Sequence, residues 1–166
     1  MIQIKNAAEL QKMRKACAIS AAALKAGGEA IEPGITTAEI DKIIYDFIVR
    51  HGARPNFLHL YGFPATACIS VNDTVIHGIP NKQQQIRPGD IVSIDTGCKI
   101  DGFNGDNACT YACGKIDLEA QRLLDVTKES LHRGIEMACG GNRVGDIGHA
   151  VQSYVCLLYT SPSPRD

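Results

Sequence analysis

The chain has 166 residues, of which 45% are hydrophobic and 21% charged, and its formal net charge is −1. This length suffices for one domain with a real core, and no stripe of lysine and arginine indicates a nucleic-acid surface. No apolar run is long enough to span a bilayer, and the chain starts with an amphipathic segment instead of a secretory signal. We therefore expect a cytoplasmic protein that binds neither nucleic acid nor membrane.

The seven cysteines are an odd number and show neither a C-x-x-C pair nor zinc-ribbon spacing. This pattern is typical of reduced cysteines in a cytosolic protein. We expect packing roles for them rather than a disulfide framework.

Two helices are expected at the start of the chain. Asn6 can cap the first, which covers about 7–28 and has one apolar face. Thr36 and Glu39 match a capping box. This box predicts a second helix that extends to about Arg50.

Between residues 53 and 110 the pattern changes to short strands and loops. Residues 67–71 are predicted as a strand, 75–80 as a strand or loop, and 87–90 as a turn. Two more helices are expected, at about 118–139 and from 144 to about 155. The apolar set of the first of these is Leu123, Leu124, Val126, Leu131 and Ile135.

The most informative stretch, residues 91–111, carries two aspartates around the pair Asp101-Gly102. Asp-Gly flanked by apolar alternation predicts a hairpin, because Gly supplies the positive φ that a type I′ turn needs. With these two residues as the loop, the cross-strand pairs include Asp95 with Ala108 and Gly97 with Asp106.

This register places the carboxylates of Asp95 and Asp106 on one face of the sheet as diagonal neighbours, roughly 7–8 Å apart at Cα. Gly97 would leave room between them, so the pair could bind a divalent metal ion. A bulge at Gly105 would change the parity and separate the two side chains, and the sequence leaves that alternative open.

His77 precedes this hairpin in a segment with two conformationally special neighbours. Gly78 permits a close backbone approach and Pro80 stiffens the chain. A neutral imidazole there could hydrogen-bond a peptide carbonyl or amide beside a metal-bound hydroxide. The alternative is a loop-stabilising histidine bonded to the backbone.

The segment 57–80, FLHLYGFPATACISVNDTVIHGIP, followed by IVSIDTG and DGFNGD, resembles the amino-terminal half of type I methionine aminopeptidases. The resemblance extends from the first helix to about Val155. It implies an α+β fold, namely the N-terminal half of the pita-bread (creatinase/aminopeptidase) fold, with an antiparallel sheet and helices on one face.

The resemblance also implies roles for individual residues. Asp95 and Asp106 would be ligands of two divalent cations, for which Mn, Fe(II), Co and Zn are candidates, and His77 would be a catalytic residue that contacts substrate. An apolar wall with a soft sulfur suits the methionine thioether. The family builds its methionine pocket at the positions of Phe57, Leu60, Phe63 and Cys68, although for Leu60 an ordinary core role is the favoured alternative.

The implied function is metal-dependent hydrolysis that removes the initiator methionine from nascent proteins. The enzyme would be a metalloaminopeptidase, a monomer at full length, and could associate with the ribosome. The family takes its third ligand from a later histidine and two more from later glutamates, and neither His132 nor His149 has that sequence context. We therefore expect the chain to be inactive by itself.

The sequence departs from the family at two positions near the second aspartate. The family often has His in the place of Asn104, and Ser or Thr in the place of Asn107. Since asparagine can hydrogen-bond in either place, we interpret both as lineage variation.

Two other functions remain open. Asp95-Thr96-Gly97 after an apolar run also matches the aspartic-peptidase motif, although the leading helices and the second carboxylate at Asp106 fit it poorly. The other alternative is a non-catalytic pita-bread relative that binds peptide. Retention of both aspartates argues against that alternative.

The final residues 156–166, CLLYTSPSPRD, look like a translated sequencing adapter. We expect residues 1–155 to be a truncated methionine aminopeptidase domain and 156–166 to be a non-native tail that is excluded from the fold. A natural flexible tail is the alternative.

Overall fold

The computed structural model describes residues 3–158, which belong to two compact units that divide after Ile116. The first unit holds helices α1 (Ala7–Glu29) and α2 (Thr37–Arg50) with a four-stranded sheet, and the second holds α3 (Leu118–Met137) and α4 (Val144–Leu158). All four helices were expected from the sequence. Helix α4 continues past the expected end at Val155, and residues 159–166 of the expected tail lie outside the described part.

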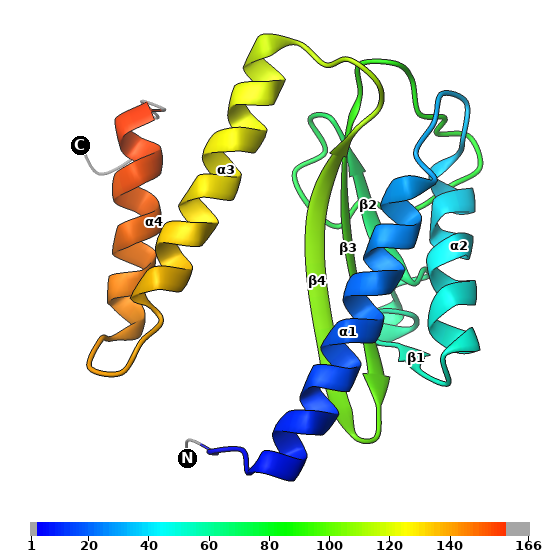
Figure 1. The fold of residues 1–166 in the computed structure, drawn as a ribbon. Helices are drawn as coiled ribbons and strands as arrows, with labels where there is room; N and C mark the ends of the chain where they lie inside the picture. Colours follow the sequence, from blue (N-terminus) through cyan, green and yellow to red (C-terminus); the bar gives the residue numbers. More distant parts are fainter. Residues whose placement is uncertain (1–2, 159–166) are drawn as a thin grey trace. The chain divides into compact units, whose positions relative to one another are not determined.

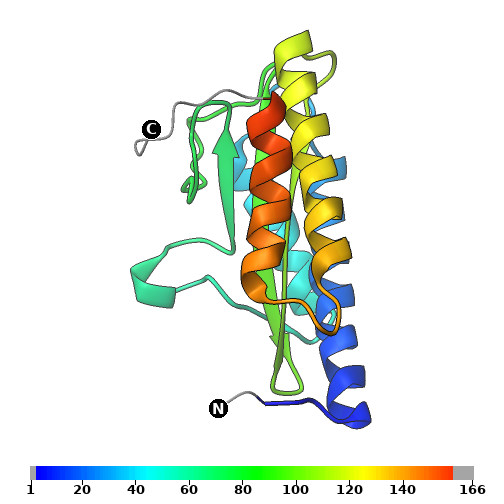
Figure 2. The same ribbon diagram turned by 90° about the vertical axis from the view of Figure 1, so that its left-hand side faces the viewer.

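The sheet is built around its longest central strand. Strand β3 (Ile91–Ile100) pairs antiparallel with β4 (Phe103–Ala112) along one edge, and with β2 (Ala67–Val71) and β1 (Arg54–Pro55) along the other. The short 3-10 helix η1 (Leu60–Gly62) lies in the connection from β1 to β2 and stands off from the strands (Figure 2). Residues 75–80, for which the sequence allowed a strand or a loop, form a loop.

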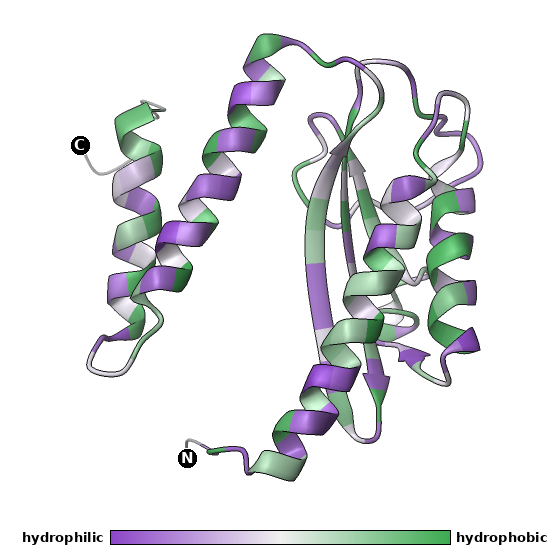
Figure 3. Cartoon of the chain, viewed as in Figure 1, coloured by the Kyte–Doolittle hydropathy of each residue, from purple (hydrophilic) through white to green (hydrophobic). Residues whose placement is uncertain are grey.

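Helices α1 and α2 lie on one face of this sheet (Figure 1), which confirms the expected layering within the first unit. The alternation of β3 explains the arrangement, because its even-numbered residues face the helices while Asp95 and Gly97 face the opposite side. Much of α2 is hydrophobic in Figure 3. The core between the layers includes Ile40, Ile44 and Ile48 of α2 and Ile69, Val92 and Ile94 of the sheet.

Both helices of the first unit begin with a complete capping box; the sequence predicted the box of α2 and, for α1, only the cap at Asn6. The Asn6 side chain accepts a hydrogen bond from the Glu9 amide at 2.9 Å, and the Glu9 carboxylate accepts one from the Asn6 amide at 2.8 Å. Thr36 and Glu39 form the same reciprocal pair at the start of α2. These bonds satisfy amides that lack a partner inside the helix and so fix where each helix begins.

Helix α1 approaches β4 closely because glycines stand between them. A Cβ atom at Gly105 would lie 2.3 Å from the carbonyl oxygen of Ala16, and one at Gly28 would overlap the ring of Tyr111. The Tyr111 hydroxyl donates to the carbonyl oxygen of Leu24 at 3.4 Å. The strand that carries Asp106 is therefore held against the backbone of α1.

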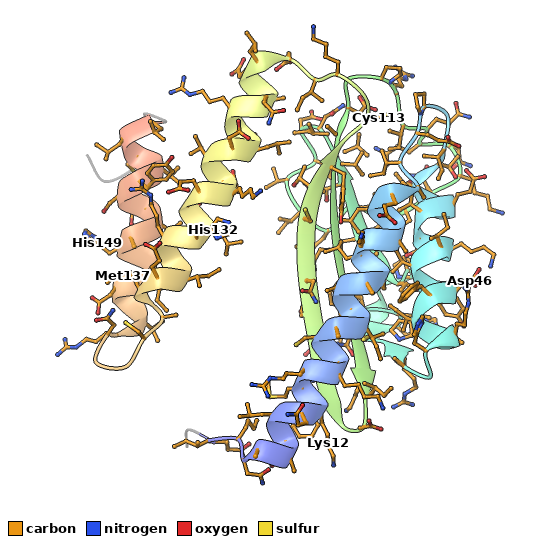
Figure 4. All side chains as sticks on the ribbon, in the orientation of Figure 1. Lys12, Asp46, Cys113, His132, Met137 and His149 are labelled. Carbon is orange, nitrogen blue, oxygen red and sulfur yellow. The ribbon has the colours of Figure 1, made fainter. Side chains whose placement is uncertain are left out.

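In the second unit, α4 packs on α3 beside Gly134, where an added Cβ would lie 2.9 Å from Val151. Of the apolar set named from the sequence, Val126 is buried, whereas Leu131 and Ile135 are each 58% exposed. Helix α4 covers only part of the circumference of α3, and the hydrophobic positions of α3 extend beyond the part that α4 covers. His132 and His149 lie on α3 and α4 (Figure 4).

None of the helices within residues 3–158 combines the length and the apolar character that crossing a membrane requires.

Candidate active site

The hairpin has the predicted turn and register. Asp101 and Gly102 both have positive φ, 51° and 85°, as a type I′ turn requires. Pairing is continuous along both strands, so no bulge occurs at Gly105, and Asp106 lies opposite Gly97. The side chains of Asp95 and Asp106 therefore project from the same face, the one away from α1 and α2.

The two carboxylates interact directly. Burial raises the pKa of Asp95, and the negative charge of Asp106 together with a hydrogen bond between the two side chains raises it further, while His77 acts in the opposite direction. Two carboxylates crowded in this way resist double ionisation. A divalent cation would relieve the repulsion, and oxygen donors suit such ions.

The space over Gly97 differs from expectation. An added Cβ at Gly97 would lie 3.1 Å from the amide nitrogen of the Asn56 side chain, so that side chain occupies the room predicted to be empty. The Asn56 backbone amide donates to the carbonyl oxygen of Gly97 at 2.9 Å, which fixes the position of Asn56. No sequence signal linked Asn56 to the aspartates, because the contact depends on β1 pairing with β3.

The pair of aspartates fits a metal ion but forms a small ligand set. Within residues 3–158, no group of three or more His, Cys, Asp or Glu side chains could hold a metal. The two carboxylates would thus supply oxygen ligands from one side, and a stable site needs additional donors.

A pocket of about 440 Å³ lies beside Asp95 in the first unit. The structure brings the sequence-predicted substrate residues together here. Leu60 is 50% exposed at this pocket, so its expected core role is wrong; η1 stands away from the sheet and leaves the side chain uncovered. The pocket is lined by Phe57, Leu60, Tyr61, Gly62, Phe63, Pro64, Cys68, His77, Ile79 and Asp95.

Cys68 forms part of the pocket wall and lies directly opposite Asp95 across β2 and β3. Burial, followed by the negative charges of Asp95, Asp106 and Asp41, raises the pKa of the Cys68 thiol to about 11. The thiol is therefore neutral at physiological pH, and a neutral thiol is neither a strong nucleophile nor a good metal ligand. Cys68 acts as a soft, small hydrophobic surface.

His77 lines the same pocket from the loop that follows β2. Its φ is 55°, in the left-handed region that few residues other than glycine adopt. No hydrogen bond joins its ring to the backbone among the residues that the structure describes, so the loop-stabilising alternative lacks support. The imidazole is available to a molecule bound in the pocket.

Asp41 is a half-buried carboxylate that sequence reasoning missed. Its Oδ1 accepts hydrogen bonds from the amides of Thr66 at 2.9 Å and Ala67 at 2.8 Å, where β2 enters the pocket wall. Burial raises the pKa of Asp41, and the two backbone hydrogen bonds offset part of that shift. The position resembles an ordinary polar residue on the second helix, and no local pattern reveals its partners.

Substituting Asp41 separates its hydrogen bonds from its charge. Asp41→Ala leaves two buried amides unpaired and is expected to cost about 1–3 kcal/mol of folding free energy, whereas Asp41→Asn keeps the Oδ1 acceptor. Because the folded pKa is raised, the contribution of Asp41 is fully present below the unfolded pKa of about 3.9 and is lost as pH rises through the folded value. In urea denaturation from pH 4 to 8, the free energy of unfolding of Asp41→Asn should increase relative to that of the wild type as the pH rises. Equal destabilisation by both substitutions would contradict this.

The side chain of Asn107 contradicts the expectation that asparagine can form a hydrogen bond at this position. It lies opposite Thr96, on the side of the sheet that faces the helices, and its Nδ2 is buried without a hydrogen-bond partner among the described residues. An unpaired buried donor is costly. The shorter side chains expected from the family would not bring this donor into the interface.

Comparison with known proteins identifies the relatives of this chain. Residues 11–159 match the model of metallopeptidase family M24. The chain is 46% and 48% identical to methionine aminopeptidases of Clostridium acetobutylicum and Clostridium perfringens, over 93% of this chain and 62% of each relative. The crystal structure of a methionine aminopeptidase from Rickettsia prowazekii superposes with a TM-score of 0.90 at 38% identity, covering 93% of this chain and 62% of that one.

These similarities confirm the α+β pita-bread fold, and the chain spans less than two thirds of the length of the relatives that it matches. The matching family consists of metallopeptidases, so the aspartic-peptidase alternative is wrong. The acidic pair of the hairpin thus lies in a chain that belongs to metallopeptidase family M24.

Proposed function

We propose that this chain is part of a metalloaminopeptidase that removes the initiator methionine from the amino terminus of nascent proteins. The observation that carries the proposal is the position of the Asp95–Asp106 pair beside an apolar pocket that also holds His77. The names of the related proteins support the same activity.

Asp95 and Asp106 would hold two divalent cations, with Co, Mn, Fe and Zn as candidates. Bound there, such ions would supply a water of lowered pKa as the nucleophile for amide hydrolysis. The mutual repulsion of the carboxylates supports this role, because it makes a cation the favoured neighbour of the pair.

The remaining residues would bind and orient the substrate. The pocket volume and its apolar lining suit one unbranched thioether side chain, with Phe57, Phe63 and Cys68 against the methionine. His77 would donate a hydrogen bond to the carbonyl oxygen of the scissile peptide and stabilise the charge that develops there. Within residues 3–158 its ring has no hydrogen bond to the backbone, which supports that role.

The nature of the substrate suggests where the protein works. An initiator methionine is exposed as a chain leaves the ribosome, so we propose a cytoplasmic enzyme, monomeric when complete, that acts on nascent polypeptides and can associate with the ribosome. We also propose that residues 1–155 form its native portion and that residues 156–166 are foreign to it.

The activity can be tested with the complete protein after chelation of metal. We expect it to release methionine from Met-Ala-Ser only after Mn, Co, Fe or Zn is restored, and to leave Leu-Ala-Ser largely intact. Calorimetry on residues 1–166 alone should show weak metal binding, since two carboxylates are the only predicted ligands. Metal binding by the complete protein without turnover would instead favour the non-catalytic, peptide-binding alternative.

A further inference from the structure

The backbone at His77 needs an external restraint. A non-glycine residue in the left-handed region is strained, and the loop before it is poorly packed, with Val75 87% and Ile76 67% exposed. The preceding residues therefore contribute little to the position of the imidazole. Whatever holds His77 in place must act from its other side.

Gly78 provides that contact by docking onto the free edge of β2. Its amide donates to the Ser70 hydroxyl at 3.1 Å, and its carbonyl oxygen accepts from the Ile69 amide at 2.9 Å. A Cβ at Gly78 would lie 2.1 Å from the Ile69 carbonyl oxygen. The backbone after His77 thus contacts β2 with no side chain between them, which agrees with the prediction that Gly78 permits a close backbone approach.

Among the described residues, Ser70 has the only side chain that accepts a hydrogen bond from the Gly78 amide. It is 5% exposed, and it lies two positions after Cys68 on the same face of β2. One strand therefore carries both the pocket wall and the anchor of the histidine. A shift of β2 would move both together, whereas loss of the Ser70 hydroxyl would release only the histidine segment.

We propose that Ser70 is a positioning residue. Its hydroxyl accepts a hydrogen bond from the Gly78 amide and thereby holds His77 in its left-handed conformation at the pocket. The proposal rests on the proposed function for its effect on turnover, but the anchor itself is a structural statement. Without the hydroxyl, the Gly78 amide loses its acceptor and His77 can relax toward ordinary backbone angles.

The test compares three variants of the complete, metal-loaded protein: Ser70→Ala, Ser70→Thr and Ser93→Ala. Ser93 is a matched control, because it lies directly opposite Ser70 across the sheet and bonds Thr110 at 2.8 Å instead of the histidine segment. Amide hydrogen exchange of Gly78 and the NMR order parameter of the His77 amide report the anchor without reference to activity.

We expect Ser70→Ala to raise Gly78 exchange at least about tenfold and to lower the His77 order parameter, while the amides of the β3–β4 hairpin keep their protection. A misplaced group that acts in the transition state lowers kcat, by up to roughly 100-fold, with KM nearly unchanged. Ser70→Thr should restore both properties, and Ser93→Ala should alter neither.

Unchanged exchange at Gly78 in Ser70→Ala would overturn the proposal. So would wild-type kcat in a Ser70→Ala protein whose Gly78 amide has lost its protection, because His77 would then not need the anchor. If the wild-type protein cannot hydrolyse methionyl peptides, the proposed function fails, and the exchange and order-parameter data still decide whether Ser70 holds His77.

Discussion

Replacing Asp95 or Asp106 by asparagine is expected to abolish peptidase activity of the complete protein and at the same time to stabilise its metal-free form. If Asp95 and Asp106 bind metal as proposed, either substitution removes one anionic ligand, and the resulting loss of activity should exceed the roughly 10–100-fold effect of disturbing residues behind the ligands. Several kcal/mol of charge stabilisation at about 1.4 kcal/mol per decade correspond to roughly 10³-fold or more in rate.

The gain in stability follows from the crowding of the two carboxylates. Burial and the charge of Asp106 raise the pKa of Asp95, so at neutral pH the folded state bears an electrostatic penalty that either substitution removes. Metal titration calorimetry measures the metal affinity, peptide turnover measures the activity, and thermal melts in chelator measure the stability of the metal-free form. Opposite signs for activity and stability are the expected result.

Asp101→Asn is the matched control for these substitutions. Asparagine tolerates the left-handed turn position, and the variant loses only an exposed ion pair with Lys15, worth about 0.2–1 kcal/mol. Its activity should stay within about twofold of the wild type. Retention of tight metal binding by Asp106→Asn would show that the hairpin pair is not the metal site.

The second large effect is expected at Gly105, where alanine should destabilise the protein by about 3 kcal/mol or more. Its Cβ would lie 2.3, 2.5 and 2.7 Å from backbone atoms of Ala16 and Cys17. Backbone inside a helix cannot rotate away as a side chain can, so α1 and β4 must separate, and such overpacking is costly. Urea denaturation measures the loss.

Gly148→Ala makes the same chemical change in an open position. Nothing lies within 4 Å of the added Cβ in α4, and alanine is the better helix former by roughly 0.5–1 kcal/mol. This variant should be slightly more stable than the wild type. A Gly105→Ala protein that unfolds at the same urea concentration as Gly148→Ala would contradict the close packing of α1 on β4.

The hairpin and the first two helices could be predicted from sequence because their determinants are local. Asp101-Gly102 fixes the turn, and the turn fixes which residues face each other across ten-residue strands. The cap at Asn6 and the capping box of Thr36 and Glu39 mark where α1 and α2 begin. The pocket residues came from resemblance to a family, since their positions 57–79 show no periodic pattern.

The missed features depend on contacts between distant segments. Asp41 lies on α2 yet bonds the start of β2, and Asn56 covers Gly97 because β1 joins the far end of β3. The burial of the Asn107 amide follows from how closely α1 approaches β4. Composition and spacing carry no information about such approaches, which are set by tertiary packing.

The uninterrupted pairing of the hairpin constrains the number of residues between Asp95 and Asp106 as well as the identity of residues such as Gly105. One inserted residue that shifted the pairing register by one position would send every β4 side chain to the other face. The acid of Asp106 would then point into the helix layer, and a side chain would replace the bare position against the Ala16 carbonyl. We therefore expect related sequences to keep the spacing between the two aspartates together with glycine at positions 102 and 105, and to vary mainly at the other positions between them.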